Sequence, residues 1–422
     1  REPLTRRVIF LFSDGEEPGL LGAYAFGTGD PLMASVESLV NLEARGSRGP
    51  AIFFESNQPN ADAIAAFANA PRPIANSVMA DVYALLSNSS DVTALTRPGL
   101  DVLNIAVLDG LEDYHTPQDN IASQDIRSVQ HMGDVALSVV RRLATKPDAD
   151  VATPMVYTDI ASRAFVAAPS WAGQVALAIC ALIAGISFWR AESANYWSAL
   201  AAPLAMIVAA GVLAFGIGFA LNILRPGAEY GFAHPEPARA WCILSALLGA
   251  VLALMLLRTA RSSAQTTAAA MLCFAVIGGL LSFLLAGISI LFAIPAALFA
   301  LGAVASLAWK PAAVIGAWLA ALAALAMWAP MLSLIELALG FEMPFALAIV
   351  AALMILPWLG LIAHVRGDGR WRELVAVVAL GLLAGAVLSG LAPSMSEARP
   401  RSLSITYFVN TTDNQARVLA GS

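Results

Sequence analysis

Two adjacent glutamates, Glu16 and Glu17, begin a set of residues whose types could carry out hydrolysis. Glu43 and His115 follow them along the chain. Carboxylate and imidazole groups are ligands that suit zinc, and a carboxylate beside a bound metal can act as general base toward water. The alternative for the pair is two acids at a helix start, where the helix dipole favours negative charge. The elements that carry these residues decide between the two interpretations.

The glutamate pair is predicted to lie on a tight turn between a strand and a helix. Val8–Phe12 is a run of β-branched and aromatic residues, which indicates a buried strand. The strand is expected to stop at Asp14, where an Asp-Gly turn begins. Pro18 then suits the first position of a helix, because its missing N–H costs nothing there.

Two further strands are predicted at Val36–Leu42 and Val102–Leu108. Glu43 directly follows the first of them, and His115 lies in the loop after the second. In open α/β sheets, ligands bind at the carboxyl ends of the strands. We therefore expect the acids and the histidine to converge at one edge of a sheet.

The remaining soluble part alternates strands with helices. Ala51–Glu55 is predicted to be a short strand, and Pro59–Ala70 and Ile74–Leu86 have helical periodicity. Ser123–Ala144 is predicted to be an amphipathic helix capped by Ser123. This alternation indicates an α/β domain with a mainly parallel sheet that helices cover on both faces.

Other polar residues near these segments have competing interpretations. Asp119 could orient the His115 imidazole or cap the next helix, and capping is the more common role. Arg45 could bind a substrate carboxylate or form a structural ion pair. His131 lies within a predicted helix, so we expect it to pack rather than bind metal, and we expect Asp91 not to touch substrate.

The composition predicts an integral membrane protein. Of 422 residues, 59% are hydrophobic and 13% are charged, and the mean hydropathy is +0.72. Apolar runs between residues 171 and 393 suffice for about eight spans of roughly 20 residues. The spans are predicted to start near Trp171, Tyr196, Trp241, Thr266, Ile288, Ala312, Pro344 and Leu374.

Charge and cysteine content argue against several classes of partner, site and function. The net charge of −6 and the lack of a basic cluster argue against nucleic acid as a partner. Cys180, Cys242 and Cys273 all fall within apolar spans, so neither a disulfide framework nor a thiolate metal site is indicated. No ionisable residue lies well inside a predicted span, whereas transporters usually carry such residues. We expect the spans to serve as anchor and scaffold in the lipid bilayer.

Basic residues fall in alternate loops between the spans, which indicates the orientation. These residues are Arg190, Arg258, Arg261, Lys310, Arg366, Arg370 and Arg372. By the positive-inside rule their loops are cytoplasmic. Both polar ends of the chain are then expected on the opposite, non-cytoplasmic side, in a periplasm or a lumen.

Three motifs in order resemble the co-catalytic di-zinc aminopeptidases, metallopeptidase family 28. They are Asp14-Gly15-Glu16-Glu17-x-Gly19-Leu20-Leu21-Gly22, Asn41-Leu42-Glu43 and Tyr114-His115-Thr116-x-x-Asp119. Their order and spacing are similar to the family's over residues 1 to about 145. The chain looks most like the membrane-bound branch, in which a multi-span region follows the peptidase domain.

The resemblance implies a role for each site residue. Glu16 matches the general base that activates the metal-bound water, and Glu17 and His115 match ligands of one zinc. Glu43 matches a ligand of the other zinc, where many relatives carry Asp, and Tyr114 lines the site. The family also needs an upstream histidine and a bridging aspartate. No histidine precedes His115, so we expect a fragment of a longer protein that binds two zinc ions.

Together these inferences predict four regions. They are a partial zinc peptidase domain at 1–150, a linker at 151–170, a transmembrane domain at 171–393, and the start of a β-rich domain at 394–422. The predicted function is a membrane-anchored zinc exopeptidase, an aminopeptidase that hydrolyses peptides with a water activated by Glu16. The alternative is an inactive peptidase-like ectodomain that acts as a binding module on a membrane scaffold. Oligomeric state and substrate preference stay open.

Overall fold

The computed structural model describes residues 3–421 except 86–87, 146–152, 192–195, 258–261, 368–370, 398, 400–403, 411 and 413–414. The chain divides into two compact units. The first comprises Arg1–Met155, Ser162–Val166 and Met395–Ser422, and the second Val156–Ala161 with Ala167–Ser394.

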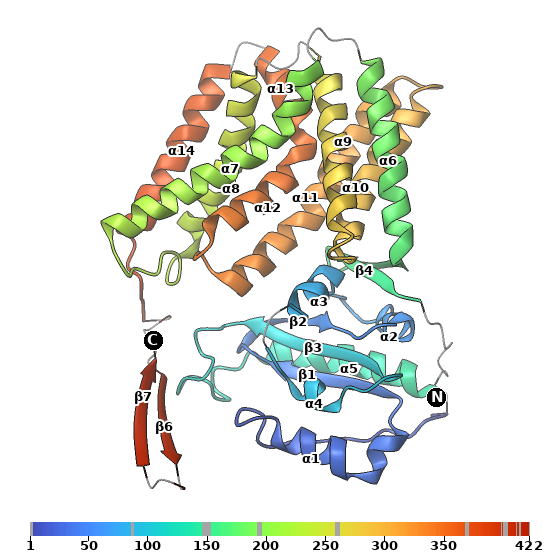
Figure 1. The fold of residues 1–422 in the computed structure, drawn as a ribbon, viewed down its shortest axis with the longest axis vertical. Coiled ribbons are helices and arrows are strands. Elements are labelled where there is room, and N and C mark those ends of the chain that lie inside the picture. The colour runs from blue at the N-terminus through green and yellow to red at the C-terminus, as the bar shows by residue number, and fades with distance from the viewer. Residues whose placement is uncertain are drawn as a thin grey trace. The chain divides into compact units, whose positions relative to one another are not determined.

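A three-stranded sheet with the order β1-β3-β2 lies at the centre of the first unit (Figure 1). Strand β1 (Ser38–Ala44) runs parallel to β3 (Asp101–Asp109), whereas β2 (Arg48–Glu55) is antiparallel to β3. The sheet is therefore mixed, and the prediction of a mainly parallel sheet is wrong. The short connection between β1 and β2 reverses the chain, because only a crossover of a dozen or more residues can join parallel strands.

Helices flank this sheet (Figure 1). They are α1 (Leu21–Gly29), η1 (Pro31–Ser35), α2 (Ala61–Phe67), α3 (Ser77–Tyr83), α4 (Asp91–Leu95) and α5 (Ile126–Thr145). The side chains of β3 from Val102 to Val107 are all buried, so both faces of the central strand are covered. The α/β class predicted for this part of the chain is thus confirmed.

Two predicted helix starts are wrong. Helix α5 begins at Ile126, where the Asp125 side chain accepts a hydrogen bond from the Arg127 N–H at 2.8 Å, so Asp125 and not Ser123 caps it. Helix α1 begins at Leu21 and not at Pro18. Leu20 has a left-handed φ of 58°, which interrupts helical geometry between Pro18 and the helix.

The predicted buried strand at Val8–Phe12 is also wrong. These residues belong to no strand, and their apolar side chains are exposed, Phe10 by 80% and Phe12 by 91%. An apolar strand is buried only where neighbouring strands and helices cover it. The sheet of β1, β3 and β2 does not include this segment.

Two hairpin-like pairs lie outside the central sheet. Strands β4 (Met155–Ile160) and β5 (Ala164–Pro169) form a two-stranded sheet within residues 151–170, which the sequence predicted as a linker. Strands β6 (Ser404–Asn410) and β7 (Gln415–Gly421) pair antiparallel. The predicted β structure in the C-terminal tail is confirmed.

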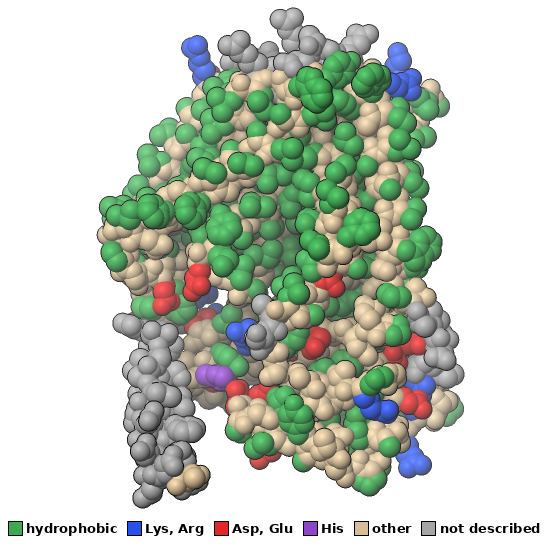
Figure 2. Space-filling view, in the orientation of Figure 1, with side chains coloured by type: hydrophobic (Ala, Val, Ile, Leu, Met, Phe, Trp, Pro, Cys, Tyr) green, Lys and Arg blue, Asp and Glu red, His purple; other side chains and the backbone are tan. Residues whose placement is uncertain are grey.

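The second unit is a helix bundle. Its helices are α6 (Ser170–Arg190), α7 (Tyr196–Leu224), α8 (Pro235–Leu256), α9 (Ser263–Leu281), α10 (Ile288–Ala305), α11 (Pro311–Leu339), α12 (Pro344–Ile355), η2 (Leu356–Trp358), α13 (Leu359–Gly367) and α14 (Trp371–Leu391). Among the described residues, eight helices are long and apolar enough to cross a membrane, with Pro344–His364 as one broken span. The predicted number of spans is confirmed. Figure 2 shows hydrophobic side chains over the bundle.

Close helix packing and peripheral charges characterise the bundle. A Cβ added to Gly249 would lie 2.8 Å from the Met206 carbonyl oxygen, so α7 and α8 approach closely at a glycine. Near the helix ends, Arg239 Nε lies 2.6 Å from Glu336 Oε2.

Of the basic residues used to orient the spans, Arg258, Arg261 and Arg370 lie outside the described residues.

Candidate functional site

The loop before α1 holds Glu16 and Glu17. Its backbone is closed by hydrogen bonds from the Leu21 N–H to the Gly15 carbonyl at 2.9 Å and from the Gly22 N–H to the Asp14 carbonyl at 2.8 Å. A Cβ on Gly22 would lie 2.6 Å from the Asp14 nitrogen, so only glycine lets the helix start approach the loop. The Glu16 carbonyl also accepts hydrogen bonds from the next turn. Sequence-local bonds thus fix the position of both glutamates.

His115 lies in the loop that follows β3. Successive turns build this loop, with hydrogen bonds from Asp113 N–H to Gly110 O at 3.1 Å and from Thr116 N–H to Asp113 O at 3.1 Å. His115 itself has a φ of 58°, in the left-handed region that non-glycine residues rarely adopt. The turn directs its ring back toward the first loop, where it meets Glu17.

The structure brings Glu17 and His115 into direct contact. Oε1 of Glu17 lies 2.6 Å from Nε2 of His115, and their side chains are 60% and 49% exposed. A carboxylate oxygen and an imidazole nitrogen this close, and open to solvent, are poised to share a proton or a cation.

Glu16 lies within the electrostatic reach of the other acids. Burial is the main cause that raises the pKa of the Glu16 carboxyl above its ordinary value. The negative charges of Glu17, Glu43 and Asp91 raise this pKa further. The His115 ring has the opposite effect. A carboxyl group with a raised pKa beside a histidine–carboxylate pair has the chemistry of a general base.

Glu43 lies at the end of β1 and Arg45 directly after it, near two stacked aromatic rings. The Tyr114 ring stacks on the His115 ring with centroids 3.7 Å apart, and the Arg45 guanidinium carbon lies 5.8 Å from the Tyr114 ring centroid. Arg45 therefore contacts the ring that neighbours His115, and no ion pair of Arg45 is found within the described part of the chain. Oε1 of Glu43 accepts a hydrogen bond from the Ala44 N–H at 3.0 Å.

The donor chemistry of the site fits zinc, but the number of donors is incomplete. Glu17 and His115 supply one carboxylate and one imidazole, both common zinc ligands. Zinc sites in proteins take three or four protein ligands. Among the described residues, no group of three or more His, Cys, Asp or Glu side chains could hold a metal ion.

Two other polar residues hydrogen-bond to backbone groups. Oδ2 of Asp119 accepts a hydrogen bond from the His115 backbone N–H at 3.4 Å. His131 is 6% exposed, and its Nδ1 accepts from the Ala51 N–H at 3.1 Å. Its Nε2 lies 3.2 Å from the Arg72 carbonyl oxygen, so the ring satisfies backbone groups, as predicted for a packing histidine.

The sequence interpretation missed the ion-pair cluster that holds the His115 loop. The side chain of Glu112 is 8% exposed and forms a salt bridge with Arg48. Arg399, from the C-terminal tail, lies 3.5 Å from the same Glu112 oxygen. The Ser47 hydroxyl donates to Asp113 at 2.6 Å. No local sequence signal announces this cluster, because its members are brought together only by folding.

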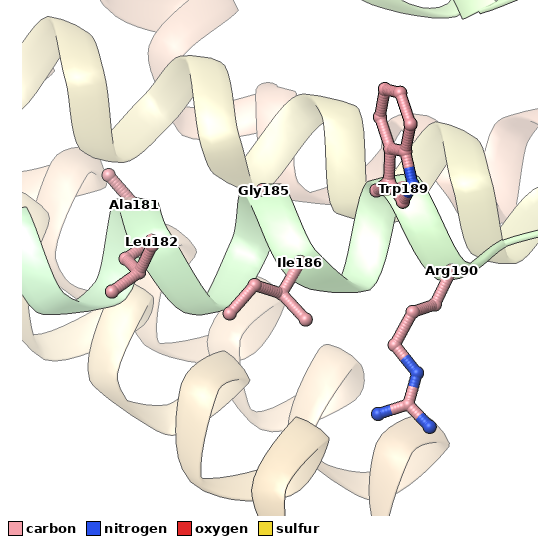
Figure 3. Close-up of a pocket in the computed structure, with 6 residues that line it drawn as sticks. All are labelled: Ala181, Leu182, Gly185, Ile186, Trp189 and Arg190. Carbon is pink, nitrogen blue, oxygen red and sulfur yellow. The ribbon is translucent and has the colours of Figure 1, made fainter.

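A separate pocket lies on α6, and its lining has no residues that could carry out hydrolysis. Its volume is about 370 Å³, and it is lined by Ala181, Leu182, Gly185, Ile186, Trp189 and Arg190 (Figure 3). Apart from the terminal guanidinium, the lining consists of apolar side chains and glycine. It offers no acid, base or nucleophile, and the two glutamates with His115 remain the candidate site.

Comparison with known proteins relates residues 1–140 to a peptidase family. The family model described as Peptidase family M28 matches residues 1–140. A vacuolar membrane protease of Yarrowia lipolytica is 32% identical over 167 residues, which cover 39% of this chain and 17% of the relative. Endoplasmic reticulum metallopeptidase 1 of Mus musculus is 28% identical over 186 residues, which cover 41% and 20%.

A putative endoplasmic reticulum metallopeptidase 1 of Schizosaccharomyces pombe is 30% identical over 152 residues, which cover 35% of this chain and 18% of the relative. The chain thus spans a fifth or less of the length of these relatives. No solved structure was found to match it.

Proposed function

We propose, on the premise that residues 1–140 are a domain of peptidase family M28, that the chain belongs to a membrane-anchored, zinc-dependent aminopeptidase. The observation that carries the proposal is the 2.6 Å contact between Glu17 and His115, with Glu16 adjacent in the same loop. A binding module has no need of a carboxyl group with a raised pKa beside such a pair.

Each site residue has a proposed task. Glu17 and His115 would hold one zinc ion and Glu43 a second, each together with further ligands. Zinc bound there would polarise a carbonyl and lower the pKa of a water molecule. Glu16 takes the proton of the attacking water on its carboxylate and passes it to the leaving amine. Tyr114 and Arg45 form the wall of the site beside His115.

The proposed substrate is the free amino end of a peptide, as the family resemblance implies. We further propose that the bundle anchors the peptidase domain on the non-cytoplasmic side of the membrane. The alternation of basic loops supports this orientation.

Peptide hydrolysis by the purified protein, at its natural length and in detergent, tests the function. Aminoacyl 4-nitroanilides should be hydrolysed, and 1,10-phenanthroline should abolish turnover until zinc is restored. Turnover that persists after complete removal of metal would refute the metal-dependent mechanism. Peptide binding without turnover in the zinc-loaded protein would favour the binding module instead.

A further inference from the structure

A buried carboxylate beside the candidate site has one oxygen without a partner. Asp91 begins α4 and is 9% exposed. Its Oδ2 accepts a hydrogen bond from the Ser13 hydroxyl, whereas Oδ1 is buried and has no hydrogen-bond partner in the part of the chain that the structure describes. Buried anionic oxygens are normally paired, because removing them from water is costly. We therefore expect a cationic hydrogen-bond donor to bind the Oδ1 atom of Asp91.

Asp91 is fixed relative to both elements that carry the site's glutamates. Ser13, its hydrogen-bond donor, lies on the loop of Glu16. The neighbouring Ser90 hydroxyl accepts from Asn104 Nδ2 at 3.1 Å, and Asn104 is fully buried in β3. Asn41 Nδ2 in turn donates to Asn104 Oδ1 at 2.9 Å, on the strand that ends near Glu43.

An apolar cluster makes this arrangement rigid. Leu20 and Ala23 from the start of α1 pack with Val92 and Leu95 of α4. Asp91 is therefore held at the loop of Glu16, and its charge acts on the Glu16 carboxyl. A preorganised carboxylate of this kind can bind a ligand without reorganising the site.

The charges around Asp91 favour a ligand cation. The negative charges of Asp91, Glu17 and Glu43 all act on the Glu16 carboxyl, so these four acids lie within electrostatic reach of one site. An ammonium group fits the free oxygen better than a metal ion. It carries three hydrogen-bond donors, and a single carboxylate oxygen can accept one of them, whereas a metal ion needs several ligands at once.

We propose that Asp91 Oδ1 binds the α-ammonium group of the substrate and so selects peptides with a free amino end. This inference rests on the proposed aminopeptidase function. Asp91 is a specificity-determining residue in this scheme, since it touches the substrate away from the scissile bond. The ammonium donates a hydrogen bond to Oδ1, while Ser13 keeps Oδ2 in place.

Calorimetric binding of two small amides tests the proposal. Leucinamide carries the ammonium, and 4-methylpentanamide is the same molecule with hydrogen in its place. The zinc-loaded protein at its natural length should bind leucinamide at least about tenfold more tightly, as a charge-assisted hydrogen bond implies. In Asp91→Asn this preference should disappear while zinc content stays the same. Asp134→Asn, at a half-buried position on α5, is the matched control and should keep the preference.

Each result that contradicts the proposal has its own meaning. Equal binding of the two amides by the unaltered protein, or a preference that survives in Asp91→Asn, would overturn the proposal. Loss of zinc in Asp91→Asn would identify Asp91 as a metal ligand instead. Asp91→Ser, which also keeps an acceptor for Ser13, replaces Asp91→Asn if thermal unfolding shows that the latter does not fold. Failure of the aminopeptidase function would appear separately, as a lack of peptide turnover with the binding preference intact.

Discussion

Nε2 of His115 lies 2.6 Å from Oε1 of Glu17, although 98 residues separate them in the sequence. The contact joins the loop before α1 to the loop after β3, and it places Glu16 beside a paired carboxylate and imidazole. Both side chains are half exposed, so a metal ion and a substrate can reach them from solvent. Substitutions of Glu16, Glu17 and His115 therefore test the function of the site.

Glu16→Gln should abolish peptide hydrolysis and leave metal content near normal. Glutamine has the size of glutamate and can hydrogen-bond water, but it cannot accept the proton. General-base catalysis contributes about 10²–10⁴-fold, so turnover should fall by at least that order. Aminoacyl-substrate kinetics together with elemental analysis check the prediction. Wild-type turnover in this variant would show that Glu16 is not the base.

Glu17→Gln and His115→Ala should lower zinc content as well as turnover. Each change removes one member of the 2.6 Å pair and therefore one proposed zinc ligand. Elemental analysis after dialysis gives the metal content of both variants. His131→Ala, which removes a histidine that bonds backbone groups, is the control and should retain zinc while it loses stability. Unchanged zinc in both site variants contradicts the ligand assignment.

Glu112→Gln should loosen the His115 loop and reduce stability by about 1.5–3 kcal/mol, the range for hydrogen bonds to charged groups. Burial alone would raise the pKa of Glu112, but hydrogen bonds from the backbone and Arg48 and the charge of Arg399 lower it below its ordinary value. A lowered pKa in the folded state means that this stabilisation is present above the ordinary value near 4.5 and is lost as pH falls below it.

Thermal unfolding of the wild type and Glu112→Gln across pH 3 to 7 checks this linkage. The difference in Tm should be largest near neutral pH and should shrink below pH 4.5. Arg399→Ala removes one partner of Glu112 and should have a smaller effect of the same sign. A pH-independent difference in Tm would show that the charge of Glu112 is not the source of its stabilisation.

Gly22→Ala should disturb the glutamate loop, because its Cβ would lie 2.6 Å from the Asp14 nitrogen. Overpacking of this kind costs about 1–3 kcal/mol, and we expect lower turnover as Glu16 and Glu17 move. Gly29, the last residue of α1, is the matched control, since an added Cβ meets nothing within 4 Å. Gly29→Ala should keep activity and stability. Equal effects of the two changes would show that Gly22 has no special role.

Single cysteines test which side of the membrane each part faces. In a background without Cys180, Cys242 and Cys273, Gly29→Cys should react with an impermeant maleimide added to intact cells, and Ala308→Cys, between α10 and α11, should not. Labelling of Ala308→Cys but not of Gly29→Cys would reverse the proposed orientation.

The sequence by itself determined the features that depend on local composition. Hydrophobic runs of membrane-spanning length predicted all eight spans, because transfer into a bilayer depends on each segment's own side chains. Strand β3 was predicted to within a residue at each end, since Val102–Leu108 is apolar except for Asn104. The first and third motifs also marked the loops that meet at Glu17 and His115.

The tertiary structure alone decided how those segments pair. The reversal between β1 and β2 makes β2 antiparallel, and the sheet leaves Val8–Phe12 exposed, although its sequence has the pattern of a buried strand. The burial of Asp91 and the pairing of Glu112 with Arg399 likewise depend on contacts between distant parts of the chain. Side-chain type is a local property, whereas burial, pairing and charge environment are set by neighbours that only the folded chain supplies.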